Sequence, residues 1–204
     1  MTHIGHSEKV FNMNRLLFIL ILTLSFQSWT KADDIRDFQV EGMSIGDKLL
    51  DFISINEIKE NTLPYFKDKR KYYVVGIIDN LKKYDQVEIY LKSNDKSYEI
   101  KTILAGVFMS DFNKCIKDKK EIVKKLDKMF INVEKMSNSK DHEADPTGNS
   151  KQNIDQYNIN YPDHIRVECT KFSEQMKNDG LAQNSLNMVV MAKEINDWIA
   201  SGYK

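Results

Sequence analysis

After residue 40, apolar residues recur with the spacing of a helix. Ser44 and Asp47 form an S-x-x-D capping signature at its start. A second capping box, Ser54 to Glu57, predicts a short helix that ends before Pro64. The pattern thus predicts two short N-terminal helices. The first of them is predicted from four apolar residues at i, i+4, i+7 and i+8, namely Ile45, Leu49, Phe52 and Ile53.

Five later segments have the pattern of β-strands. The first, 72–79, is almost continuously apolar (YYVVGIID), which predicts a central strand. Segments 87–92 and 98–109 alternate around an Asn-Asp turn, which predicts an antiparallel hairpin. Segments 164–172 and 186–192 complete the set, and a short edge strand is also expected at 38–40.

The longest amphipathic pattern, residues 110–134, predicts a helix. Its stripe consists of Phe112, Cys115, Ile116, Val123, Leu126, Met129, Phe130 and Val133. Ile195, Trp198 and Ile199 predict a short terminal helix that stops at Gly202. Residues 136–162 are polar and show no apolar period, which predicts a long mobile loop.

These elements predict a single α+β domain over residues 33–204. We expect an antiparallel sheet of about five strands, covered on one side by the 110–134 helix, with the two short helices near one edge. A chain of this length can bury its own core.

Residues 1–32 have the features of a signal peptide. A basic Arg15 precedes an apolar run over 16–26, which is shorter than the roughly 20 residues that span a bilayer. Ala32 fits position −1 of a cleavage site. Residues 1–12 resemble an extension upstream of a true start at Met13, and an uncleaved anchor is the alternative. The expected location is the periplasm or the exterior, with no transmembrane segment after cleavage.

Cys115 and Cys169 are the only cysteines in the chain. Export would place them in an oxidising compartment, where disulfides form and persist. Cys115 is on the buried stripe of the long helix, and Cys169 points to the face that this helix should cover. A Cys115–Cys169 disulfide is therefore predicted, with two buried free thiols as the alternative.

The charge balance offers no nucleic-acid site. Three of the 30 basic and one of the 30 acidic residues lie in the leader, so the mature chain carries a net charge near −2. Both signs are interspersed, whereas nucleic-acid binders concentrate basic residues on one face. The lysine-rich helix 110–134 also contains acidic residues and is interpreted as a solvated surface.

Ser44 lies in a G-x-S-x-G motif (GMSIG), the nucleophile-elbow pattern of serine hydrolases. That elbow follows a strand of a sheet already formed, and only about ten mature residues precede Ser44. The serine is explained more simply as a helix cap. His164, at the start of a strand, is the other mature histidine besides His142 and gives little basis for acid–base chemistry.

Four potential metal ligands lie close together in the predicted loop: Asp141, His142, Glu143 and Asp145. The first, third and fifth positions fit a calcium loop, but Pro146 replaces the required glycine and Gln152 the bidentate glutamate. A helical zinc pair would need a second histidine. We therefore expect a solvated charge cluster, without a metal or other cofactor.

Tyrosines are concentrated near the predicted hairpin. Outward-facing aromatics can form a recognition surface, although tyrosine is also a good strand former. The possible binding face comprises Tyr72, Tyr73, Tyr90 and Tyr98, with Tyr84 nearby.

The segment 40–50 (VEGMSIGDKLL) resembles an "EGMSIGDSLLDYF"-type start found after the leader in small exported proteins of AT-rich marine bacteria. The likeness extends to the helix CIKDKKEIVKKL, an acidic Gly-Ser loop, the strand IRVEC and a final Trp-Ile. Lys48 replaces the usual serine. This resemblance implies an exported protein but no particular chemistry. The Gly-Met start before a meander is also similar to the outer-membrane assembly family BamE/SmpA, whose members are usually shorter and lipid-anchored.

Together these features predict a non-catalytic, exported interaction or envelope-associated module. Its unidentified protein or envelope partner would contact the open sheet face or the 136–162 segment. The alternatives are a small-ligand binder with a cleft between helix and sheet, and a hydrolase that uses Ser44 or a loop metal.

Overall fold

The computed structural model describes residues 34–66, 71–142, 145–160, 163–179 and 183–202, so the predicted leader lies outside the described part. The strands are β1 (Thr62–Leu63), β2 (Tyr72–Ile77), β3 (Gln86–Lys92), β4 (Ile100–Phe108), β5 (Glu134–Asp141), β6 (Lys151–Asn158), β7 (His164–Lys171) and β8 (Ser185–Met191). The α-helices are α2 (Ile55–Glu60), α3 (Phe112–Met129), α4 (Glu174–Asn178) and α5 (Lys193–Ala200), and two 3-10 turns are η2 (Ile35–Asp37) and η3 (Leu49–Asp51).

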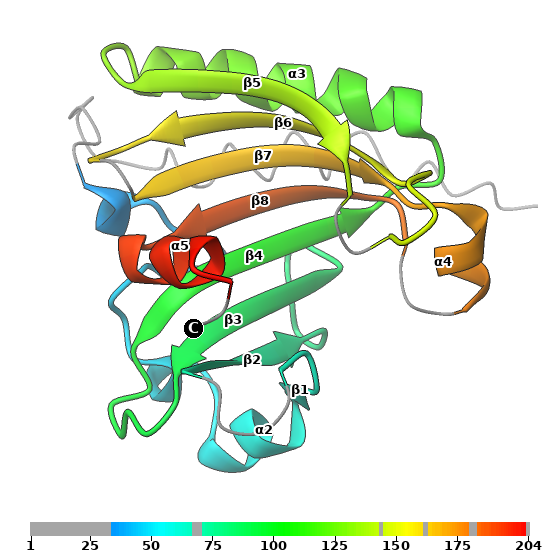
Figure 1. Ribbon diagram of the computed structural model, residues 1–204. Helices are drawn as coiled ribbons and strands as arrows, with labels where there is room; N and C mark the ends of the chain where they lie inside the picture. The colour runs from blue at the N-terminus through cyan, green and yellow to red at the C-terminus, as the bar shows by residue number, and fades with distance from the viewer. Residues whose placement is uncertain (1–33, 67–70, 143–144, 161–162, 180–182, 203–204) are drawn as a thin grey trace, which may run out of the picture.

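All these strands form one antiparallel sheet, in the order β1-β2-β3-β4-β8-β7-β6-β5 (Figure 1). Two meanders, β1 to β4 and β5 to β8, are joined where β4 pairs with β8, with Leu104 opposite Val189. Because the last strand returns to the middle of the sheet, β1 and β5 are its two edges.

The predicted α+β fold, with about five strands covered by one long helix, was wrong. The structure is mostly one eight-stranded antiparallel sheet with few, mainly short helices. The five strands predicted from apolar patterns are β2, β3, β4, β7 and β8. Strands β5 and β6 were missed because their side chains are mainly polar, and β1 because it has two residues.

The prediction of a mobile loop over 136–162 was also wrong for the described residues. Strands β5 and β6 pair over their whole length, from Glu134 opposite Asn158 to Asp141 opposite Lys151. Strand β6 in turn pairs with β7. The segment is therefore a β-hairpin that extends the sheet.

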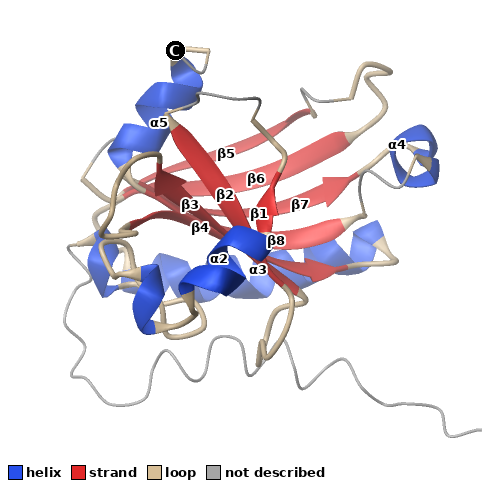
Figure 2. Ribbon diagram, turned by 90° about the horizontal axis from the view of Figure 1, so that it is seen from below, coloured by secondary structure: helices blue, strands red, loops and turns tan. Residues whose placement is uncertain are grey.

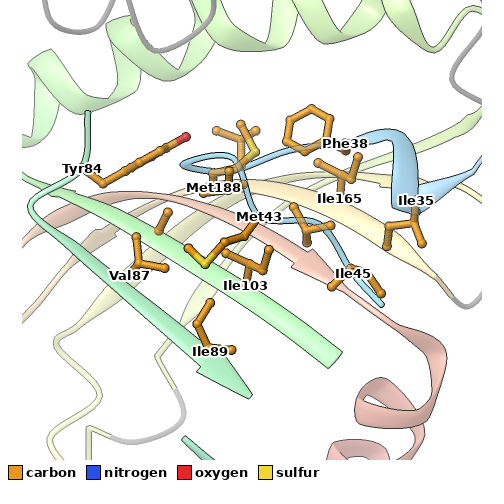
Figure 3. Close-up of a cluster of buried hydrophobic side chains, with 14 of the residues drawn as sticks. Ile35, Phe38, Met43, Ile45, Tyr84, Val87, Ile89, Ile103, Ile165 and Met188 are labelled. Atoms are coloured by element: carbon orange, nitrogen blue, oxygen red, sulfur yellow. The ribbon is translucent and has the colours of Figure 1, made fainter. Parts of the chain in front are cut away.

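Helix α3 and the N-terminal segment cover the same face of the sheet. Helix α3 packs mainly against β7. The N-terminal segment lies beside it and packs four side chains onto the strands, namely Ile35, Phe38, Met43 and Ile45 (Figure 3). They meet the strand residues Val87, Ile89, Ile103, Ile165 and Met188. This face holds the larger hydrophobic core.

Helix α5 lies on the opposite side of the sheet from α3 (Figure 2). Its Trp198 is buried, with ring centroids 5.0 Å from Tyr72 and 4.9 Å from Phe66. Val189 and Met191 of β8 complete this smaller core. A sheet that is covered in part on both faces explains why every residue of β8 is buried, Ser185 and Asn187 included.

The first predicted N-terminal helix, over 45–53, does not form; only η3 is present there. Gly42 and Gly46 have φ of +87° and +92°, which an α-helix cannot contain. The Gly46 and Leu49 N–H groups instead donate to backbone oxygens of Ile100 and Tyr98. The expected edge strand at 38–40 is reduced to one bridge between Val40 and Met43.

The second N-terminal helix was predicted correctly. Ser54 caps α2: its hydroxyl accepts from the Glu57 N–H at 3.3 Å, and the Glu57 carboxylate accepts from the Ser54 N–H at 2.8 Å. This is the reciprocal capping box that the sequence indicates.

Candidate functional site

Cys115 and Cys169 lie at disulfide distance, as predicted. Their sulfurs are 1.99 Å apart and their Cα atoms 5.9 Å apart, and both side chains are buried. The pair links the start of α3 to β7. The cysteines therefore fasten the helix to the sheet and are not available as nucleophiles or metal ligands.

Ser44 does not cap a helix, and it does not form a catalytic pair with His164. It is buried in a turn, where its N–H donates to the Asp47 carboxylate at 2.8 Å. Its neighbours Met43 and Ile45 belong to the core on the α3 side. His164 alternates with Ile165 of that core, so its side chain points to the opposite face. A hydrolase based on these two residues is not supported.

The predicted metal ligands are engaged separately. The Asp141 carboxylate lies 2.5 Å from the Lys151 Nζ. The His142 ring packs against the Phe172 ring, with centroids 4.9 Å apart. Asp145 accepts hydrogen bonds from Ser150 and from Thr147, which hold its pKa well below its ordinary value. Glu143 lies outside the described residues. Within the described ranges, no group of three potential ligands is close enough to hold a metal ion.

The four tyrosines of the predicted binding face do not share one face. Tyr72 and Tyr90 lie on the α5 side, and the Tyr72 hydroxyl donates to Glu194 at 3.0 Å. Tyr73 and Tyr98 pack against the larger core on the α3 side. Burial raises the pKa of Tyr73 to about 12, in keeping with a packed side chain.

The described residues enclose a small cavity between α3 and the sheet. This cavity, lined by residues that include Tyr84, Ile122 and Leu186, has a volume of about 10 Å³. That is room for about one water molecule. This cavity is too small for the organic ligand that a cleft between helix and sheet was predicted to bind.

The candidate site that remains is the outer edge of β5. All eight residues of β5 are exposed, and in the described part of the chain no strand pairs with this edge. Figure 1 shows β5 as the outermost strand, beside α3. Every second residue of an edge strand directs its N–H and C=O away from the sheet. The edge therefore presents a row of backbone donors and acceptors.

The two edges of the sheet differ in how they are protected. At the other edge, β1 has only two residues and is followed by Pro64, which has no N–H. Strand β5 is four times as long and contains no proline. Lysines normally discourage pairing at an edge, but Lys135 is 2.8 Å from Asp127 of α3, which neutralises its charge. The centre, 137–139, is the small neutral sequence Ser-Asn-Ser.

Polar contacts hold the β5–β6 hairpin in place. Lys119, of which only 3% is exposed, forms an ion pair with Asp155 of β6. The Ser137 hydroxyl donates to Asp155 at 2.5 Å, and the Asn153 amide donates to Ser139 at 2.7 Å. Burial alone would raise the pKa of Asp155, but the hydrogen bonds from Lys119 and Ser137 outweigh it and lower that pKa. The edge is thus a fixed template.

A second set of contacts ties α3 to the same hairpin. The Tyr157 hydroxyl donates to Asp127 at 2.6 Å and to the Val123 carbonyl at 3.2 Å. Burial, and then this bond to Asp127, raise the pKa of Tyr157, so the phenol stays protonated. Burial opposes ionisation of Asp127, yet the bonds from Lys135 and Tyr157 leave its pKa below the usual value.

This edge was not predicted because β5 and β6 lack apolar alternation. The signal that would have found it is the turn sequence Pro146-Thr147-Gly148-Asn149 between two polar segments of similar length, which is typical of a hairpin.

Comparisons with known proteins add no function. No protein-family model matches the sequence, and neither curated proteins nor solved structures include a significant match. The resemblance to small exported proteins therefore stays a prediction. Among the described residues, no helix combines the length and apolar character needed to cross a membrane.

Proposed function

We propose that this protein is an exported interaction module, periplasmic or secreted, that binds a partner by adding an extended strand to β5. The main support is the unpaired, eight-residue edge of β5, whose neighbour β6 is held on α3 by the buried Lys119–Asp155 pair. Strand addition uses main-chain hydrogen bonds for affinity and flanking side chains for specificity. The leader-like segment 1–32 and the Cys115–Cys169 link support the exported location.

Backbone bonds alone would give this site limited affinity. An antiparallel strand along β5 can form about eight backbone hydrogen bonds, since every second residue exchanges two. At a net value of about 1 kcal/mol each, they are comparable with the roughly 4–15 kcal/mol cost of association. Side chains beside the edge must therefore decide which strand binds.

Export has a direct test. The full chain is expressed in a bacterium with a periplasm, and the periplasmic fraction is analysed by N-terminal sequencing. We expect a chain that begins at Asp33. Recovery of the intact chain from the cytosol would refute export but would leave the β5 surface untested, so the binding site needs its own experiment.

Site-specific photo-crosslinking tests the binding surface. A photoreactive amino acid replaces Lys140 on β5 or, as a control, Glu121 on α3, whose side chain is 59% exposed. Crosslinking is carried out in the periplasm of the producing cell. We expect a discrete crosslinked product from position 140 and none from position 121. Equal labelling at both positions, or none at either, would overturn the proposed binding site.

A further inference from the structure

We propose that the strand added to β5 is β5 of a second copy of this chain, in the antiparallel register that places Asn138 opposite itself. This inference rests on the proposed function, because it names the partner of the same edge. The two sheets would continue into each other across a two-fold axis, as in symmetric dimers whose interfaces use one surface twice.

Charge complementarity supports this register. With the axis at Asn138, Lys135 lies opposite the partner's Asp141, and the symmetry makes this pair twice. Opposite charges directly across a strand pair stabilise it. Met136, 53% exposed, would lie against the partner's Lys140 and lose contact with water.

The neighbouring registers are less favourable. A two-fold axis between two residues is excluded, because it would place an even-numbered residue opposite an odd-numbered one and so put equivalent side chains on opposite faces of the continued sheet. An axis at Ser137 gives one favourable pair type, Glu134 with the partner's Lys140. In the Asn138 register, both members of the favourable pair already belong to ion pairs.

The favoured pairs also extend ion pairs that already exist. Lys135 is 2.8 Å from Asp127, and Asp141 is 2.5 Å from Lys151. Dimer pairing would link them into a chain of alternating sign, from Asp127 through Lys135 to the partner's Asp141 and Lys151. Residues opposite each other in the Asn138 register are both even or both odd in number, so the two α3 faces would lie on the same side. Networks of this kind contribute more than isolated surface pairs.

The test is the oligomeric state of the mature protein by sedimentation velocity over a range of concentrations. We expect twice the chain mass for the wild type. Asp141→Lys puts two like-charged pairs into the interface, which should raise the dissociation constant by about tenfold or more. Lys135→Glu should do the same. Glu121→Lys, on the exposed side of α3, is the matched control and should leave the dimer unchanged.

Mixing the two interface variants gives the sharpest result. An Asp141→Lys chain paired with a Lys135→Glu chain has opposite charges at both sites, so we expect a mixed dimer although each variant alone is weak. Native mass spectrometry with one tagged chain detects it. A monomeric wild type, or a dimer insensitive to Asp141→Lys, would overturn this inference. If position 140 still crosslinked to another protein, the proposed function would stand; without crosslinking, both would fall.

Discussion

Lys119 of α3 and Asp155 of β6 form an ion pair that is almost withdrawn from solvent, with 3% and 14% of their side chains exposed. The pair lies between the helix and the hairpin whose outer strand is the candidate binding edge. Removal of one partner would leave the other charge buried without compensation, which is more costly than loss of the pair itself.

We therefore expect Asp155→Ala to lower the free energy of unfolding by about 3 kcal/mol, while the additional change Lys119→Met should recover part of that loss. Urea denaturation of the single and double variants measures both. Asp118→Ala, which breaks the exposed pair with Lys114, is the control and should cost less than about 1 kcal/mol. Equal losses for Asp155→Ala and Asp118→Ala would contradict a buried role for Lys119.

Acid should weaken the helix–hairpin contact. The pKa values of Asp127 and Asp155 are lower in the folded protein than in an unfolded chain. The unfolded state then binds more protons, so the stabilisation is fully present above about pH 4 and is lost as the pH falls through the folded pKa values. Denaturation midpoints between pH 2 and 6 test this, and Asp155→Asn should give a shallower dependence. An equally steep pH dependence in Asp155→Asn would contradict the role given to Asp155.

The disulfide should contribute through the unfolded chain. Cys115 and Cys169 are 54 positions apart, and a cross-link of that span restricts the unfolded state by roughly 4 kcal/mol in the chain-entropy model. We expect the variant with both cysteines changed to alanine to lose about that much stability and to be insensitive to reductant. Alkylation of both thiols in the untreated wild-type protein would show instead that the bond is absent.

Gly106 of β4 leaves room for a side chain of β8. A Cβ at this position would lie 2.8 Å from the Asn187 Oδ1. We expect Gly106→Ala to cost about 1–3 kcal/mol, and less in an Asn187→Ala background. Gly76→Ala is the control, because its Cβ would meet only the flexible end of Leu63 at 3.2 Å. Thermal denaturation distinguishes them, and an equal cost in both backgrounds would refute the steric explanation.

The sequence predicted those elements that bury apolar side chains. Strands β2, β3, β4, β7 and β8, together with α3, each face a core, so burial imposes a hydrophobic period on them. Apolar spacing gave the wrong prediction at 45–53, where the spaced apolar residues belong to a largely irregular segment. There the Gly46 and Leu49 N–H groups bond to the backbone at the start of β4 and just before it, which a local pattern cannot predict.

The candidate site was the part least visible in the sequence. Strand β5 is exposed on both faces and carries no periodic signal, and β6 is held partly by Lys119 and Asp127 from a helix far from it in sequence. Polar long-range pairs leave no mark on local hydropathy. The cysteine pair could be predicted because two thiols allow a single pairing.

Amide hydrogen exchange along β5, followed residue by residue by NMR, tests the central claim most directly. Alternate amides of β5 bond to β6, and the intervening ones point outward. If β5 pairs with β5 of a second copy, both sets will be protected in the concentrated wild-type protein, and Asp141→Lys will release only the outward set. Outward amides that exchange at unprotected rates in the wild type at every concentration would contradict it.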